Sequence, residues 1–426
     1  MQNFSCIKKI PFILVAVLLV VVSCAGRQKF KKIDVPEAYM QSYLANKPAK
    51  LRPGFRAMLE EGKRNYVLNN MRVGTDALLL RHLEIAKKCF DNALNYIEAV
   101  FADNEKAKKA RSLWYEEGMK DFKGEPYERV MAYYYRGLLY LMDKDYENAR
   151  ACFKSGIIQD AFAEENQNRC DFALLLFLEG YSSLKLGDHQ LATAAFNELK
   201  KLRPDFTLPS HDSNLLIIVE TGTSPRKLAD GVGHGELKFF RGRNIMEKRV
   251  TLHIDDEEFT AYPIEDIAWQ AMTRGSRPVD KIIKGQVQFR KTHEKIGTTL
   301  TDISSNMLLA SPLTSHSDTI SGVSAALGIL GVAEMALAAR TRTHADTRYW
   351  DNLPDSVHIV CLKIAPGSYQ LRTKYLNDSS VKVSEDIEKI KITALDANSM
   401  ILLWKRPGIN YIWYARQDSN LRPTDS

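Results

Sequence analysis

The chain has 426 residues, of which 45% are hydrophobic and 26% are charged, and these are ordinary values for a globular protein. The composition excludes a collagen, a polytopic membrane protein and a mainly disordered chain, and the length allows two or three domains. The 59 Lys and Arg residues outnumber the 52 Asp and Glu residues, which gives a formal net charge of +7. A positive charge is compatible with nucleic acid or an anionic membrane as a partner, so its position along the chain matters.

The N-terminus has the parts of a secretory signal peptide. Lys8 and Lys9 precede an unbroken apolar run from Ile10 to Val22, and small residues follow that run. The run is shorter than the ~20 residues that a membrane-spanning helix needs. We therefore predict that residues 1–23 are an export signal.

The sequence that follows, Val21-Val22-Ser23-Cys24, resembles the lipobox of bacterial lipoproteins. The resemblance implies that the Cys24 thiol is acylated, which makes the lipid bilayer a partner of the protein. The same resemblance, with Ala25 rather than Asp directly after Cys24, implies an outer-membrane location facing the periplasm in a host with two membranes. An ordinary signal peptide with a chance cysteine, or an uncleaved anchor, are the alternatives.

The positive charge lies almost entirely near the N-terminus. Residues 24–50 contain Pro36 and Pro48 and are polar and basic, which predicts a lipidated tether. Once the lysines of the signal and the four basic residues of 24–32 are set aside, residues 33–426 carry a net charge of only +1. We therefore predict no nucleic-acid partner.

The four cysteines after Cys24 give no sign of a metal site. None forms a CxxC pair or lies at zinc-ligand spacing from a histidine, so we predict neither a metal nor a cofactor. A disulfide between Cys152 and Cys170 is compatible with an oxidising compartment, but nothing in the local sequence requires it.

The first half of the chain has a recurring helical pattern. Residues 51–216 have apolar residues at i, i+3 and i+4 and few helix breakers. A glycine, an alanine twelve residues later and an aromatic residue four further recur as Gly74/Ala86/Phe90, Gly137/Ala149/Phe153 and Gly180/Ala192/Phe196. The pattern predicts pairs of helices that approach closely at the small residues.

This pattern resembles the tetratricopeptide repeat, although the glycines are 63 and 43 residues apart instead of about 34. The resemblance implies a helical array whose first helices line a concave groove for a protein or peptide. An unspecific helical bundle, in which these side chains are core residues, is the alternative. The residues predicted for the partner-binding groove are Tyr134, Leu138, Leu141, Phe177, Tyr181 and Lys185.

The second half, residues 217–414, changes to short alternating segments, which predicts an α+β or β-rich domain. A hairpin is expected around residues 255–258, with strands 249–254 and 259–264, and the other expected strands are 236–240, 357–363, 369–374, 389–393 and 399–405. Residues 319–339 are apolar but contain Glu334, so they fit either a packed helix or a second membrane helix. The tail, residues 415–426, is expected to be disordered.

The segment Ala345-Asp-Thr-Arg-Tyr-Trp-Asp-Asn-Leu-Pro-Asp355 carries a second resemblance. It is similar to a segment of an uncharacterised family of bacterial lipoproteins that join a tetratricopeptide-like array to a C-terminal domain. The resemblance implies no activity. For Asp346 and Arg348 we predict a structural ion pair beside a buried Trp350.

The sequence contains no GxSxG elbow, no HExxH motif and no P-loop, so we predict no catalytic residue. Together, these features predict a membrane-anchored lipoprotein that serves as a scaffold or adaptor for an envelope protein. An envelope hydrolase with its catalytic site in the C-terminal domain, and a membrane-complex subunit that inserts residues 319–339, are the alternatives.

Overall fold

The computed structural model describes residues 32–101, 121–161, 171–230, 236–243, 246–273, 346–394 and 399–407. Several predictions from sequence lie outside these residues. They concern the signal at 1–23, the acylated Cys24, the disulfide partner Cys170, the apolar segment 319–339 and the tail 415–426. None of the described helices is long and apolar enough to cross a membrane.

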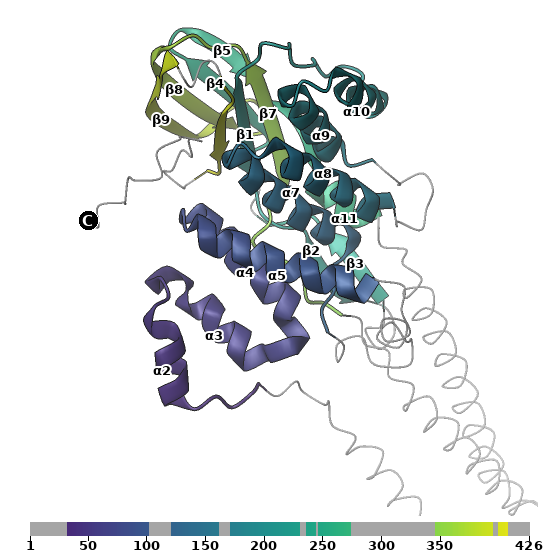
Figure 1. Ribbon diagram of the computed structural model, residues 1–426, viewed down its shortest axis with the longest axis vertical. Helices are drawn as coiled ribbons and strands as arrows, with labels where there is room; N and C mark the ends of the chain where they lie inside the picture. Colours follow the sequence, from purple (N-terminus) through teal and green to yellow (C-terminus); the bar gives the residue numbers. More distant parts are fainter. Residues whose placement is uncertain are drawn as a thin grey trace, which may run out of the picture.

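The first half of the chain consists of helices, as the periodicity predicts. Three helical hairpins follow one another and stack, with α5 against α7 and α8 against α9, and Figure 1 shows them as a continuous row. The helices of these hairpins are α4 (Tyr66–Leu79), α5 (Leu83–Phe101), α7 (Pro126–Met142), α8 (Tyr146–Ala161), α9 (Ala173–Lys185) and α10 (His189–Leu202).

In each hairpin, the glycine that the sequence pattern identifies in the first helix lies against the aromatic ring of the second helix. A Cβ atom added to Gly180 would lie 2.5 Å from the ring of Phe196, so only glycine lets the two helices approach this closely. A Cβ atom on Gly137 would lie 2.4 Å from the ring of Phe153, and one on Gly74 would lie 3.0 Å from the ring of Phe90, a tight contact but a less severe one. The α9–α10 turn uses Gly187 at φ +77°, and the Asp188 side chain caps α10 by accepting the Leu191 amide.

The predicted tether is shorter than expected. Residues 37–45 form α2 (Glu37–Ala45), which is followed by α3 (Arg52–Glu61) and two short 3₁₀ turns at Ala49–Leu51 and Gly62–Asn65. Met40 is 1% exposed and packs into the core of the helical half. Pro36, which suggested an extended linker, is instead the N-cap of α2, so the folded body begins well before residue 51.

The second half contains two four-stranded sheets. In the first sheet the order is β10-β1-β7-β6, with β10 parallel to β1 and the other pairs antiparallel. Its strands are β1 (Leu215–Thr221), β6 (Tyr262–Asp266), β7 (Ser356–Leu362) and β10 (Ile401–Lys405). The second sheet is antiparallel in the order β5-β4-β8-β9, with strands β4 (Arg249–Ile254), β5 (Glu257–Thr260), β8 (Gly367–Leu376) and β9 (Lys382–Ile392).

A separate hairpin of β2 (Arg226–Asp230) and β3 (Glu236–Phe240) and the short helix α11 (Ile267–Thr273) complete the described part of the chain. The hairpin around residues 255–258 is confirmed as β4–β5. Its predicted second strand is divided, because the chain leaves one sheet after Thr260 and enters the other at Tyr262 as β6.

The helices, the first sheet and the second sheet form three layers with β1 at the centre. All seven residues of β1 are buried. Leu216 and Ile218 belong to the core shared with the helices, whereas Ile217 and Val219 belong to the core between the two sheets. The α+β class is confirmed, and the expected domain boundary at residue 216 falls inside this central strand, so the helices and the sheet share one core.

Candidate functional site

The segment Asp346–Asp355, which we call the wedge segment, lies between the helical array and the first sheet. Trp350, at its centre, is fully buried, with ring centroids 6.2 Å from Phe90 of α5 and 5.7 Å from Tyr135 of α7. Leu353 is 2% exposed and belongs to the same core. The wedge segment therefore fills the space that the helical hairpins leave beside the sheet.

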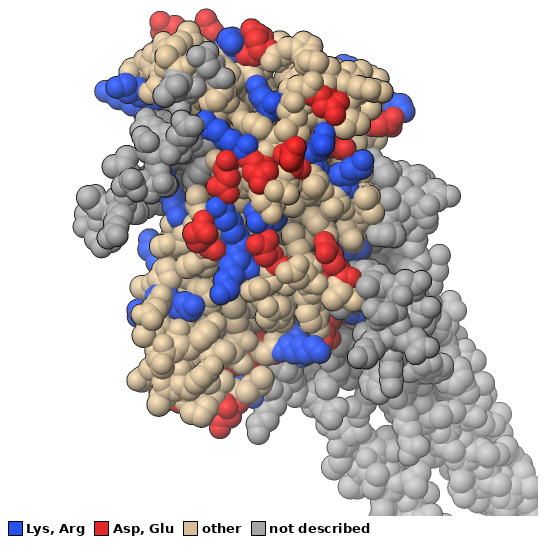
Figure 2. Space-filling model, in the orientation of Figure 1, with Lys and Arg blue, Asp and Glu red and all other residues tan. Residues whose placement is uncertain are grey.

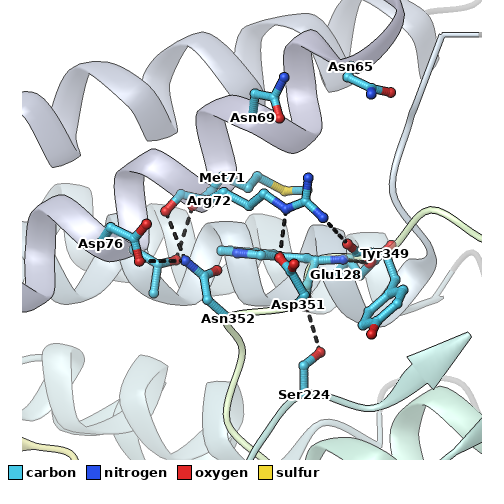
Figure 3. A network of polar contacts seen from close by, with 12 residues as sticks. Asn65, Asn69, Met71, Arg72, Asp76, Glu128, Ser224, Tyr349, Asp351 and Asn352 are labelled. Carbon is cyan, nitrogen blue, oxygen red and sulfur yellow. Dashed lines mark hydrogen bonds and ion pairs between the residues drawn. The ribbon is translucent and has the colours of Figure 1, made fainter. Parts of the chain in front are cut away.

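The backbone of the wedge segment is held on both sides of Trp350. The Trp350 amide donates to Oε1 of Glu128 over 2.6 Å, and the Trp350 carbonyl accepts from Oγ of Ser224 over 2.6 Å. Figure 3 shows Glu128 and Ser224 on opposite sides of the wedge segment. Buried backbone groups need such partners, and here one comes from α7 and the other from the turn before β2.

Helix α4 binds the next residues of the wedge segment through polar contacts (Figure 3). Arg72 Nε lies 2.6 Å from Oδ1 of Asp351, and Arg72 Nη2 donates to the Tyr349 carbonyl. The side-chain amide of Asn352 donates through Nδ2 to Oδ1 of Asp76 over 2.9 Å and to the Arg72 carbonyl over 3.0 Å. These contacts fix the register between α4 and the wedge segment.

The predicted ion pair of Asp346 and Arg348 is confirmed. Arg348 donates to both carboxylate oxygens of Asp346 at 2.8 and 2.6 Å, and its third nitrogen donates to Asn65. Burial acts to raise the pKa of Asp346, but Lys227 and Arg348 outweigh that effect and hold the pKa below its usual value. Both residues have a structural role, and Trp350 is buried as expected.

Glu220 joins the helices, the first sheet and the residues after β10 in one buried contact. Its carboxylate is fully buried and accepts hydrogen bonds from the hydroxyls of Tyr134 and Tyr135, the indole of Trp404 and Nε of Arg406, at 2.6 to 3.0 Å. Arg406 also donates to the Asn352 carbonyl over 2.8 Å. The charge of Glu220 is thus matched by an arginine and by three neutral donors, as a buried carboxylate requires.

A second cluster of buried charges lies at the N-terminus of α7. Glu125 and Glu128 form a reciprocal capping box, and Lys227 from β2 makes an ion pair with Glu125 while both side chains are 2% exposed. Burial raises the pKa of Glu128 to about 7, against the attraction of Lys227. Glu128 therefore links the first turn of α7 to the wedge segment through a carboxyl group that titrates near neutral pH.

The predicted partner-binding groove is not open. The six residues lie on α7 and α9, and the contacts of Tyr134 and Phe177 are those of core side chains, since Phe177 packs against Phe196 of α10 and against Phe206. Tyr134 donates to Glu220, and Lys185 is half-buried with its ammonium group on the Ser213 carbonyl. Tyr134, Leu138, Leu141, Phe177 and Tyr181 are all 0% exposed. The prediction that they line a groove for a partner is wrong for this arrangement, because aromatic residues at these helix positions serve a core equally well.

The residues that form the buried network were not found from the sequence, although signals for some of them exist. Glu220 is the single charge at the end of an apolar run, and Arg406 is the second of two basic residues that follow another such run, Ile401–Trp404. Glu125-Pro-Tyr-Glu128 has the spacing of a capping box. What the sequence does not contain is the pairing of Glu220 with Arg406, which are 186 positions apart.

No group of three or more metal-ligating side chains occurs within the described ranges. The free cysteines there are Cys89, Cys152 and Cys361, and burial raises the pKa of each thiol, to about 12, 12 and 11 respectively. Such thiols are poor nucleophiles at neutral pH.

Comparison of the chain with protein-family models, with curated proteins and with solved structures finds no match in any of the three.

Proposed function

We propose that the protein is a lipid-anchored scaffold of the bacterial envelope, attached to the outer membrane through acylated Cys24, facing the periplasm and binding another envelope protein. The single observation that carries the anchor is the sequence Val-Val-Ser-Cys24 directly after a signal-like apolar run. Acyl chains contribute ~0.8 kcal/mol per buried CH₂ group, so several of them hold a protein on a membrane durably.

The helical hairpins support the scaffold role. We infer that they are degenerate tetratricopeptide repeats, because each has the glycine-to-ring contact and the short turn that the repeat pattern calls for. Arrays of this kind serve binding in most known settings. On the face shown in Figure 2, basic and acidic residues are interleaved, which agrees with the small net charge of residues 33–426 and favours a protein over nucleic acid as the partner.

Because the inner face of the array is filled, the partner would contact the outer face. Ile158 on α8 and Leu191 on α10 are 50% and 44% exposed, and both lie on the second helices of their hairpins. Arg150 of α8 lies 3.5 Å from Asp188, the N-cap residue of α10. The outer face of α8 and α10 is therefore our proposed contact surface.

Two measurements test the proposal separately. Metabolic labelling with a palmitate analogue is expected to label the wild type but not Cys24→Ala, and only Cys24→Ala is expected to leave the membrane fraction. Photo-crosslinking residues at positions 158 and 191, compared with position 381 on the β8–β9 turn, are expected to capture the same envelope protein from intact cells. A labelled Cys24→Ala variant would refute the anchor, and equal capture from position 381 would refute the contact surface.

A further inference from the structure

Large apolar side chains are exposed on two neighbouring elements, the β2–β3 hairpin and α11. Leu228 and Phe240 of the hairpin and Trp269 and Met272 of α11 are between 41% and 45% exposed, and we call these four residues the α11 patch. No other tryptophan within the described ranges is more than 4% exposed. Large apolar groups that lie together at the surface commonly mark a contact with another surface.

The pairing of β2 with β3 shows which side chains of the hairpin face outward. Lys227 and Phe239 are opposite each other, and both point inward, because Lys227 makes an ion pair with Glu125 and the Phe239 ring packs against α7. Successive residues of a strand face opposite sides. Leu228 and Phe240 therefore project from the outer face of the hairpin, as diagonal neighbours across the two strands.

The charges of the hairpin are balanced. Basic residues, Arg226 and Lys238, lie opposite the two apolar residues, and two positions further along the strands Asp230 pairs with Glu236. The exposed apolar side chains, and not an excess of positive charge, therefore distinguish this surface.

One carboxylate joins the two parts of the α11 patch. Asp266 accepts from the Trp269 amide through Oδ1 over 2.9 Å and from Arg241 through Oδ2 over 2.5 Å. Arg241 directly follows Phe240, and α11 packs against β3. Trp269 and Met272 are three residues apart in a helix and so lie on one face of it. The exposed residues of the hairpin and of the helix are therefore adjacent.

The α11 patch lies near the point where the described chain begins. The Ile33 amide donates to α3, and the Phe122 amide donates to the carbonyl of Arg64 in the 3₁₀ turn that follows α3. Three residues after Phe122, Glu125 makes its ion pair with Lys227 of β2. Short steps thus connect the first described residues to the hairpin, and Figure 1 shows α2, α3 and the hairpin below the second sheet.

A bilayer that holds an acylated Cys24 has to lie close to this end of the molecule. Lys32 is fixed at α3 by an ion pair of 2.6 Å with Glu60, and the chain advances eight residues from Cys24 to Lys32. An extended chain covers at most about 3.6 Å per residue, so Lys32 is no more than about 29 Å from Cys24. Part of the surface at this end therefore faces the membrane.

We propose that the α11 patch rests on the surface of the lipid bilayer, with Phe240 and Trp269 at the level of the headgroups. This contact rests on the proposed function, since it presupposes the anchor at Cys24. Aromatic side chains favour the membrane–water interface, where the ring leaves water and the indole N–H keeps a hydrogen-bond partner. The stems of Arg226 and Lys238 can lie along the apolar residues while their charged ends reach the headgroups. A second contact beside the anchor would give the scaffold a fixed orientation on the membrane.

The test uses the full-length protein in intact cells, with a photo-crosslinking residue at position 240 or 269. The matched control is position 387 on β9, because Ile387 is 55% exposed and lies in the second sheet. It is therefore at least as accessible as the two test positions. Adducts are identified by mass spectrometry as phospholipid, as another protein or as a crosslink within the chain. Labelling of the same samples with a palmitate analogue reports the acylation of Cys24 separately.

We expect phospholipid adducts at positions 240 and 269 and only background at position 387. Such adducts without palmitate labelling would support the contact and refute the anchor. Palmitate labelling without phospholipid adducts at 240 and 269 would overturn the contact and leave the anchor intact. Equal phospholipid adducts at position 387, or capture of another protein or of this chain in place of lipid at 240 and 269, would also overturn the contact.

Discussion

The contact between Glu220 and Arg406 gives the sharpest quantitative prediction. Both side chains are largely buried, at 0% and 12% exposed, and the two charges are 2.6 Å apart. Glu220→Gln removes the negative charge and replaces one acceptor oxygen with an NH₂ group. That group meets Nε of Arg406 or the indole of Trp404, both of which are donors. An arginine is then left buried without its partner.

We expect Glu220→Gln to lower the free energy of unfolding by about 3–5 kcal/mol, the range for breaking a buried ion pair on one side. Arg406→Met should cost a similar amount, because it leaves the Glu220 carboxylate with neutral donors alone. The double variant Glu220→Gln/Arg406→Met should cost clearly less than the sum of the two, since neither charge is then stranded.

The assay is urea unfolding of the chain with Cys24→Ala, followed by circular dichroism, in a double-mutant cycle. The control is a surface ion pair, Lys201 with Glu198, whose side chains are 69% and 57% exposed. The cycle of Lys201→Gln and Glu198→Gln should give a coupling energy of less than about 1 kcal/mol. If Glu220→Gln stayed within about 0.5 kcal/mol of the wild type, or if the Glu220 and Arg406 effects were additive, the reasoning would be refuted.

Three further predictions concern the same body. Trp350→Ala should cost about 3–5 kcal/mol in urea unfolding, with Trp350→Phe milder, and a smaller loss would mean that the wedge segment is not packed as described. Gly180→Ala should destabilise by about 1–3 kcal/mol, because the new methyl group would meet the ring of Phe196; a gain would show that the helices can separate. Burial raises the pKa of Glu128 from 4.5 to about 7, so its protonation favours the folded state fully below pH 4.5. This contribution is lost as pH rises through 7. The free energy of unfolding of the wild type, relative to that of Glu128→Gln, should therefore fall between pH 4.5 and about pH 7. A difference that stays constant over this range would contradict the raised pKa.

The helical half was predictable because its local pattern and its packing agree. Glycines and aromatic residues at fixed spacing specified which helices approach each other, and Gly180 with Phe196 shows that contact directly. The β4–β5 hairpin was predictable for the same reason, since alternating residues flank the acidic turn at 255–258. Local signals of this kind do not depend on the rest of the fold.

The central strand β1 is not predictable from periodicity, which instead predicts that the helical region extends to Leu216. Its residues Leu215–Thr221 are buried on both faces, between the helices and the second sheet. A strand buried on both faces has no alternation, so a short apolar run cannot be distinguished from the end of a helix.

The sequence predicts that Tyr134 and Phe177 line an open groove, whereas both are core residues. Phe177 packs against Phe196 and Phe206, and Tyr134 donates to Glu220. Local patterns do not show that β1 and the wedge segment pack against α7. Long-range contacts such as Trp350 with Tyr135 depend on topology, which local patterns do not carry.

Trp350 of the wedge segment and Glu220 of the first sheet pack against α7 and fill the predicted groove there. The most direct test is the rate at which a maleimide labels the Leu138→Cys variant, measured by peptide mass spectrometry. The control is Ala151→Cys, on the exposed side of α8. Leu138 is 0% exposed, so we predict that Leu138→Cys is labelled only when the protein unfolds, whereas Ala151→Cys is labelled at once. Equal labelling of the two positions in the native protein would contradict the claim and restore an open groove.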